Sequence, residues 1–400
     1  MMSNINDVLN DLIASQSYKN ADGSYNRLRG SSDATPDVVA EADLKVPESI
    51  DELLRLAVEQ GASDIHIVVG APPKFRINGE LMPVRQYSVL TADINRKILS
   101  PIIMDDEISD QFDKDGDLDF AYQIKGVARF RVNLYKQRGT WAGVFRMLSN
   151  HVPSVKELKL PQSIVNLTTK KRGLILVTGP TGSGKSTTLA SLIAEINEHY
   201  RKNVITLEDP IEYLHKQKMC NVSQREIGVD TKSFASALRA SLREDPDVIL
   251  VGEMRDFETI STAITAAETG HLVLSTLHTI GAAATVDRII DTYPVKQQSQ
   301  ARSQLSAVIE GVISQQLVPK ADGSGRVAAF EIMTGTTAIR NLIREGKTEQ
   351  MGSTIQTSRR DGMVLLDDNL QDLVKQGIIT PERAIEFAVD KKTMASRMRL

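Results

Sequence analysis

Apolar residues along this 400-residue chain follow two different patterns. Between about 46 and 150, short apolar runs alternate with polar residues, as in strands that are buried on one face only. The strands predicted in this way are 63–70, a hairpin at 74–81 around an Asn78-Gly79 turn, 118–124, 128–135 and 140–147. Helical spacing at 47–58 and 91–102 adds two helices. The pattern therefore predicts a small α+β domain at 46–150.

From about 163 onward, continuous apolar runs are separated by helical stretches. The continuous runs are 173–178, 203–207, 248–251 and 272–276. Such runs, alternating with helices, are typical of a parallel sheet that is covered on both faces. Beyond Tyr293 the spacing predicts helices at 297–316, 337–345, 364–376 and 381–389. The predicted class is α/β, with a main domain at 163–400 whose last part, about 294–400, is helical.

Two further segments lie outside these domains. Near-helical spacing of Ile5, Val8 and Leu12 predicts a short amphipathic helix at the start of the chain, and 16–44 is poor in apolar residues. We expect 1–45 to be a flexible leader, which serves either as a solubilising tail or as a docking segment. A linker is predicted at 151–162, between the two domains.

Composition narrows the possible classes. The formal net charge is -3, with 48 Lys and Arg against 51 Asp and Glu, which argues against a surface that coats nucleic acid. The single cysteine, Cys220, excludes an internal disulfide framework and a zinc site built from cysteines. There is no secretory signal pattern, and no apolar run approaches the roughly 18 residues of a membrane span. We expect no transmembrane segment and a cytosolic protein.

The most specific motif is the glycine-rich stretch LILVTGPTGSGKS at 174–186. It satisfies the phosphate-loop pattern G-x-x-x-x-G-K-[ST], in which the glycines let backbone amides surround a phosphate. Lys185 would reach the β and γ phosphates, and Ser186 would bind Mg²⁺. The residues predicted to bind nucleotide are Gly179, Pro180, Thr181, Gly182, Ser183, Gly184, Lys185, Ser186 and Thr187. The sequence thus predicts binding of a nucleoside triphosphate such as ATP with Mg²⁺.

Acidic residues and a histidine follow other predicted strands. Glu253 follows the run 248–251, where a carboxylate can orient or deprotonate water at the γ-phosphate; an ordinary turn acid is the alternative. Glu208 and Asp209 follow the run 203–207 and suit Mg²⁺ bound through water. His278 follows the run 272–276 at the same predicted edge, a place to sense the γ-phosphate.

Other polar residues have two possible interpretations. Arg129, Arg131, Arg138 and Arg146 lie on or between predicted strands of the first domain. They are either solvated strand residues or a source of positive charge for phosphates across an interface. His271 closes a predicted helix and suits a structural role there. We expect His66, on an alternating strand, to serve packing or an interface.

Taken together, these motifs resemble the secretion ATPases that power type IV pili and type II secretion, and within that family the motors that retract pili. The resemblance covers roughly 46–370. The matching stretches are ASDIHIVVGAPPKFRINGEL (62–81), RFRVNLYKQRG (129–139), GPTGSGKSTTLA (179–190), ITLEDPIEYLH (205–215), REDPDVILVGEMRD (243–256), TAAETGHLVLSTLHT (265–279) and AIRNLIREGK (338–347).

The resemblance implies a PAS-like first domain and a RecA-like ATPase domain, assembled as a ring of six. It implies roles for the singled-out residues as well. Glu208 and Asp209 match the family's acidic box, and Glu253 matches its general base. His271 and His278 match its histidine box, so that His271 would contact nucleotide. Arg131, Arg138 and Arg146 match arginines that the family's first domain supplies to bound nucleotide.

The resemblance also implies partners and a direction of work. It implies a Mg²⁺-dependent motor, peripheral at the inner membrane, that acts on a platform protein and depolymerises pilin. The segment 338–345, AIRNLIRE, is tied to retraction, whereas the zinc module common in extension and secretion ATPases needs four cysteines. The leader and 391–400 lie outside the family pattern. The alternatives are an extension or type II secretion ATPase, an accessory retraction motor, a nucleotide-binding scaffold and a RecA-like nucleic-acid motor. With 4% aromatics, the last is disfavoured.

Overall fold

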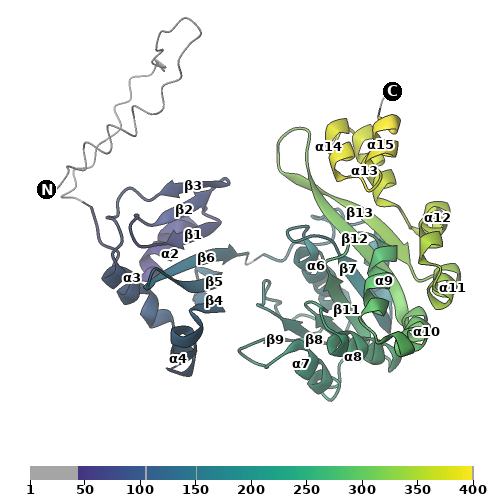
Figure 1. Ribbon diagram of the computed structural model, residues 1–400, viewed down its shortest axis with the longest axis horizontal. Coiled ribbons are helices and arrows are strands. Elements are labelled where there is room, and N and C mark those ends of the chain that lie inside the picture. The colour runs from purple at the N-terminus through teal and green to yellow at the C-terminus, as the bar shows by residue number, and fades with distance from the viewer. Residues whose placement is uncertain (1–43, 104–105, 150, 399–400) are drawn as a thin grey trace, which may run out of the picture.

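The computed structural model describes residues 44–103, 106–149 and 151–398. Their strands form two sheets, one in a first domain and one in a second domain, which a short connection joins (Figure 1). The predicted leader helix lies outside the described residues. Among the residues described, no helix has both the length and the apolar character needed to cross a bilayer.

The first domain holds an antiparallel sheet in the order β3-β2-β1-β6-β5-β4. Its strands are β1 (Asp64–Ile67), β2 (Lys74–Ile77), β3 (Glu80–Pro83), β4 (Asp117–Ile124), β5 (Ala128–Gln137) and β6 (Thr140–Leu148). Its helices are α2 (Ile50–Glu59), α3 (Ala92–Leu99) and α4 (Asp106–Asp115). Alternate side chains of β5, such as Phe130 and Val132, pack in one core with these helices. The arginines of β5 lie on the opposite face.

The second domain holds a larger sheet in the order β13-β12-β7-β11-β10-β8-β9, parallel except for β13. Its strands are β7 (Gly173–Thr178), β8 (Asn203–Glu208), β9 (Asn221–Glu226), β10 (Val248–Val251), β11 (Leu272–Leu277), β12 (Ile309–Pro319) and β13 (Arg326–Thr334). Its helices are α5 (Gln162–Val165), α6 (Lys185–His199), α7 (Phe234–Ser241), α8 (Phe257–Glu268), α9 (Ala282–Asp291), α10 (Gln298–Val308), α11 (Thr337–Glu345), α12 (Met351–Thr357), α13 (Leu366–Lys375), α14 (Pro381–Phe387) and α15 (Lys391–Arg397).

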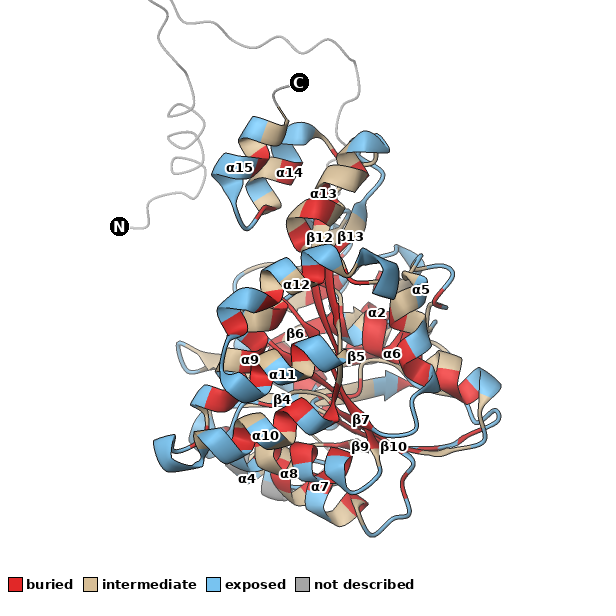
Figure 2. Cartoon of the chain, turned by 90° about the vertical axis from the view of Figure 1, so that its right-hand side faces the viewer, coloured by how far each residue is buried: buried red, intermediate tan, exposed pale blue. Residues whose placement is uncertain are grey.

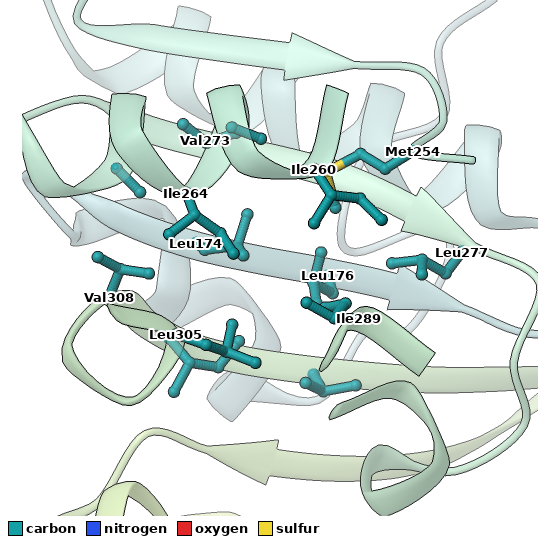
Figure 3. Packing of buried hydrophobic residues seen from close by; sticks show 14 of the residues in the cluster. Leu174, Leu176, Met254, Ile260, Ile264, Val273, Leu277, Ile289, Leu305 and Val308 are labelled. Carbon is teal, nitrogen blue, oxygen red and sulfur yellow. The ribbon is translucent and has the colours of Figure 1, made fainter. Parts of the chain in front are cut away.

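Strand β7 is apolar throughout because both faces of the sheet are covered. Leu174 and Leu176 pack towards α8, α9 and α10, as Figure 3 shows. Ile175 and Val177 pack on the opposite face against Leu192 of α6 and its neighbours. The buried residues accordingly concentrate on the strands and on the inner sides of the helices (Figure 2). A continuous apolar run is what this two-sided burial requires.

The helix expected over 297–316 is wrong beyond Val308. The chain forms the shorter helix α10 and then enters β12, which lies between β7 and β13. Leu305, Val308, Ile309 and Val312 have helical spacing, which explains the prediction. Burial of both faces of the strand outweighs this local pattern, because β-branched residues pack well in a central strand. Strand β13 was not predicted either.

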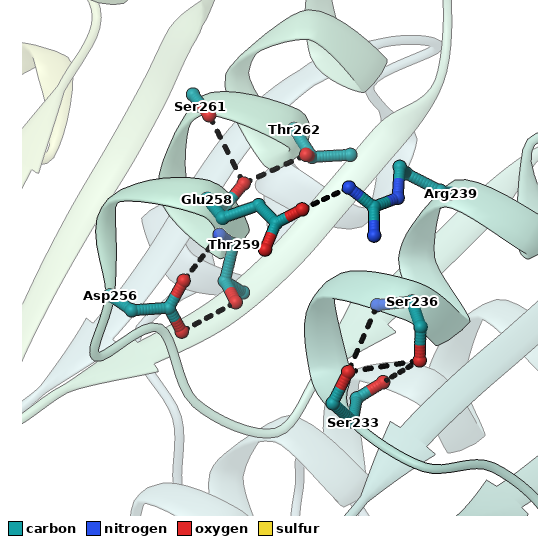
Figure 4. Close-up of polar contacts among 8 residues, drawn as sticks. All are labelled: Ser233, Ser236, Arg239, Asp256, Glu258, Thr259, Ser261 and Thr262. Atoms are coloured by element: carbon teal, nitrogen blue, oxygen red, sulfur yellow. Dashed lines mark hydrogen bonds and ion pairs between the residues drawn. The ribbon is translucent and has the colours of Figure 1, made fainter.

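Helix α8 begins at Phe257, directly after the loop that carries Glu253, and side chains near its start fix it there (Figure 4). Asp256 Oδ1 accepts from the Thr259 amide at 2.8 Å, and Oδ2 accepts from the Thr259 hydroxyl at 2.8 Å. Glu258 pairs with Arg239 of α7. This capping holds the far end of the loop that follows β10.

A buried carboxylate joins two other helices to the sheet. Glu331 of β13 accepts from the backbone amide of Ala282 at 2.7 Å and from that of Leu366 at 3.5 Å. Burial raises its pKa, and the two amides lower it. The starts of α9 and α13 therefore share one anchor in the hairpin β12–β13.

Candidate functional site

The predicted phosphate loop connects β7 to α6 and depends on its glycines. Gly179, Gly182 and Gly184 have φ angles of 139°, 78° and 88°, which side chains rarely adopt. A Cβ on Gly179 would lie 2.2 Å from the carbonyl oxygen of Gln315. The loop ends at the start of α6, so backbone amides and the positive end of the helix face the same space.

Polar groups of the loop suit an anion. Lys185 Nζ donates to the carbonyl oxygens of Gly179 at 2.9 Å and Pro180 at 3.0 Å. Burial lowers the pKa of Lys185, while Glu253 and Glu212 raise it. The Ser183 hydroxyl is buried and, among the described residues, has no hydrogen-bond partner. Ser186 is exposed on the first turn of α6. An unused buried donor and a buried ammonium group on one loop fit a bound phosphate.

Gln315 of β12 holds the phosphate loop in place, and the sequence did not identify it as a site residue. Its Nε2 donates to the Ser183 carbonyl oxygen at 2.6 Å, and its Oε1 accepts from the Thr188 hydroxyl at 2.8 Å. The side chain thus ties the end of the loop to the first turn of α6. No local signal marks this residue, because 297–316 is predicted as a helix.

The acids after β8 lie in a polar network. Glu208 Oε1 accepts from the Thr206 hydroxyl at 2.6 Å and from Gln224 Nε2 at 3.0 Å. Loss of solvent raises the pKa of Glu208, and these two bonds lower it. Burial also raises the pKa of Asp209, which Arg131 of the first domain opposes. Residues 208–213 form a segment that we call the acidic loop. The Thr187 hydroxyl lies 2.9 Å from the Tyr213 hydroxyl, and this contact joins the acidic loop to α6.

The structure brings Glu253 and His278 together. Strands β10 and β11 are parallel neighbours, so their carboxyl ends meet at one edge. Glu253 Oε2 lies 3.6 Å from His278 Nε2, and Oε1 lies 2.8 Å from Arg255 Nε. Through its effect on the pKa of Lys185, Glu253 is also coupled to the phosphate loop. This edge therefore holds the phosphate loop, Glu253 and His278, with the acidic loop on the neighbouring strand β8.

His271 lies at the opposite edge. Its carbonyl oxygen accepts from the Gly173 amide at 3.0 Å, at the start of β7, whereas the phosphate loop follows the end of β7. A six-residue strand spans roughly 20 Å. The Nδ1 atom of His271 lies 2.9 Å from the Ala266 carbonyl oxygen, which is the structural role that the local pattern suggests. The chain does not bring His271 to its own phosphate loop.

The arginines of the first domain differ in their surroundings. Arg131 lies close enough to Asp209 to lower the pKa of that carboxyl. Arg146 pairs with Asp64 at 2.8 Å and is 68% exposed, and Arg138 is exposed in the turn after β5. Arg129 is buried against the second domain. Of the predicted Arg131, Arg138 and Arg146, the described part of the chain shows only Arg131 beside the acidic loop.

A cavity of about 710 Å³ lies beside the phosphate loop. Gly184, Thr187 and Gln315 line one side, residues 157–161 of the interdomain connection another, and Leu373 of α13 a third. Its volume is in the range of sites that hold drug-sized ligands. The cavity therefore adjoins the end of the phosphate loop and the first turn of α6.

A phosphate loop at the carboxyl edge of a parallel sheet, with acids and a histidine beside it, defines a nucleotide-binding protein of the P-loop class. The sequence matches the family "Type II/IV secretion system protein" over residues 39–388, and the chain belongs to this family. The resemblance found in the motifs is thereby confirmed.

Named relatives agree with this assignment. The "Type IV pilus retractation ATPase PilT" of Pseudomonas aeruginosa is 48% identical over 339 residues, which cover 85% of this chain and 98% of that protein. The "Twitching motility protein" of Neisseria gonorrhoeae is 45% identical over 347 residues, covering 87% and 92%. A crystal structure of the pilus retraction motor PilT with bound ADP has a TM-score of 0.81 at 48% identity and covers 87% of this chain and 99% of its own. The predicted α/β secretion-ATPase fold is confirmed.

The bracing by Gln315 gives a testable prediction. Gln315→Ala removes two hydrogen bonds that hold the phosphate loop, each worth about 1 kcal/mol. ATP should therefore bind up to about thirtyfold more weakly, as measured by titration calorimetry. Gln316→Ala is the matched control, because the adjacent side chain points to the other face of the strand. Equal affinities in both variants would contradict the assignment.

Proposed function

We propose that this chain is an ATP-hydrolysing motor that powers retraction of type IV pili, and with it pilin depolymerisation and twitching motility. The observation that carries the proposal is the sheet edge that gathers Lys185, Glu253 and His278. It occurs in a chain that is 48% identical to a retraction ATPase along nearly the whole of that protein. The motor is an ATPase whose hydrolysis is coupled to mechanical work.

The segment AIRNLIRE supports retraction over extension. It forms α11, in which Ile339 and Ile343 are buried. Arg340 donates to the carbonyl oxygens of Gly335 at 2.7 Å and Ser306 at 3.0 Å, and pairs with Glu310 at 2.6 Å. One face of this helix is thus fixed to the sheet. The face with Asn341 and Arg344 is exposed and free to meet a partner.

Each residue of the edge has a role in the proposed hydrolysis. Lys185 leaves its two carbonyl partners and holds the β and γ phosphates. Glu253 orients a water and takes its proton, and His278 lies beside Glu253 to sense the γ-phosphate. Mg²⁺, when bound, neutralises phosphate charge, and Ser186 with Glu208 and Asp209 through water are the residues that would hold it.

The proposed assembly is a ring of six copies. His271 lies at the edge opposite the phosphate loop, and Arg138 and Arg146 are exposed, so these three residues are available to contact nucleotide in a neighbouring copy. Arg131 adds positive charge beside the acidic loop. In the ring, hydrolysis drives rotation of the domains, which acts on an inner-membrane platform protein and through it on pilin. The motor works in the cytoplasm, peripheral to the inner membrane, without nucleic acid.

Replacement of Glu253 tests the proposed base. Glu253→Gln keeps the size of the side chain but cannot accept the proton of the attacking water, so hydrolysis should fall by about 10² to 10⁴. ATP affinity should stay within about twofold of the original, because the phosphate loop is intact. Glu59→Gln, at an exposed position of α2 in the first domain, is the control and should leave both quantities unchanged. Near-normal hydrolysis by Glu253→Gln would remove Glu253 from this role.

The hydrogen bond from Thr206 tests the role of Glu208. The bond stabilises the carboxylate and lowers its pKa, so Thr206→Val should raise that pKa further. The acid-side fall of hydrolysis should move to higher pH by up to about one unit. The control Thr168→Val removes a buried hydroxyl that donates to the Val165 carbonyl oxygen instead. The proposal would be contradicted if the fall of hydrolysis at acidic pH stayed at the same pH or moved to lower pH.

A deletion strain tests the direction of work. Loss of a retraction motor should leave cells with abundant surface pili and no twitching, scored by electron microscopy and a motility assay. The gene carrying Glu253→Gln should not restore motility, whereas the gene carrying Glu59→Gln should. Cells without pili would instead identify an extension motor.

A further inference from the structure

Arg129 is buried although it lies on the outer face of its sheet. Along β5, Phe130 and Val132 point into the core of the first domain, and Arg129 and Arg131 point away from it. Arg129 is nevertheless only 8% exposed, because the second domain covers it. A buried guanidinium persists only when its charge and its donors are satisfied.

The partners of Arg129 lie in the second domain. Its Nη1 donates to the Ile211 carbonyl oxygen at 2.8 Å, and its Nη2 lies 3.4 Å from Glu226 Oε2. The same oxygen of Glu226 accepts from the Ile211 amide at 3.1 Å. Arg129 and Glu226, which is 5% exposed, therefore hold Ile211 through both its carbonyl and its amide.

Ile211 belongs to the acidic loop, two residues after Asp209. Within the second domain this loop is held by Gln224, which donates to Glu208, and by the contact of Tyr213 with Thr187 of α6. Arg129 adds a hydrogen-bonded contact from the first domain. The acidic loop thus touches both domains at once.

We propose that Arg129 is a positioning residue that makes the placement of the acidic loop depend on the first domain. When the first domain moves, Ile211 moves with Arg129, and the positions of Glu208 and Asp209 at this edge of the sheet change as well. This inference rests on the proposed function, in which domain movement accompanies hydrolysis. It gives that movement a defined route to the acids expected to hold Mg²⁺.

Hydrogen–deuterium exchange of the nucleotide-free chain tests the contact itself. Arg129→Met should make the peptide that covers 208–213 exchange several-fold faster, while the phosphate-loop peptide stays unchanged. Arg129→Lys keeps the charge and one donor and should restore part of the protection. Arg85→Met, an exposed arginine of the same domain, is the control. Unchanged exchange at 208–213 would overturn the proposal, and because this experiment needs no hydrolysis, its failure is distinct from failure of the proposed function.

The dependence of hydrolysis on Mg²⁺ tests the consequence. In Arg129→Met the Mg²⁺ concentration for half-maximal hydrolysis should rise several-fold, while ATP affinity in EDTA stays unchanged. The double variant Arg129→Met/Glu226→Gln should be no worse than the single variant, since it removes the carboxylate that the single variant leaves unpaired. Faster exchange at 208–213 with unaltered Mg²⁺ dependence would leave Arg129 as a structural contact and overturn the positioning role.

Discussion

The close approach of the phosphate loop to β12 is the constraint on which the rest of the site depends. Gly179 lies so near the Gln315 carbonyl that no side chain fits, and the Gln315 amide holds the other end of the loop. This contact exists because β12 lies beside β7 in the parallel sheet. The shape of the loop is thus set by a strand that follows it by more than a hundred residues, as well as by its own glycines.

Charge at this edge is controlled by burial. Glu208 and Asp209 sit where loss of solvent disfavours the ionised form, and neighbouring donors and Arg131 favour it. Lys185 is likewise partly desolvated and has acids nearby. Opposing effects of this kind leave each group responsive to an added charge. A phosphate or a cation entering the edge therefore alters several of these groups together.

The sequence predicted those features that are local. The phosphate loop is a contiguous motif, and the runs at 173–178 and 248–251 are apolar because both of their faces are buried. The failures are those that depend on distant partners. Leu305 to Val312 have helical spacing, and only the presence of β7 and β13 makes 309–319 a strand.

The surroundings of individual side chains also depend on distant partners, which the sequence does not reveal. Arg131 and Arg129 are two residues apart on one strand, yet one lies beside Asp209 and the other is buried against Ile211. The two histidines differ in this respect, because the local pattern already places His278 after the run 272–276 and His271 before it, and the structure has them at opposite edges. Which of the two arginines lies beside Asp209 is decided by packing between the domains.

The cavity beside the phosphate loop has a thermodynamic consequence. Its walls come from the interdomain connection, from the loop with β12, and from α13. A ligand that fills it is linked to the stability of all three, by about 2.7 kcal/mol at a hundred times its Kd. The C-terminal helices, which carry no residue of the phosphate loop, then become harder to unfold as the concentration of such a ligand rises. Their melting reports the occupancy of a site that belongs mostly to other parts of the chain.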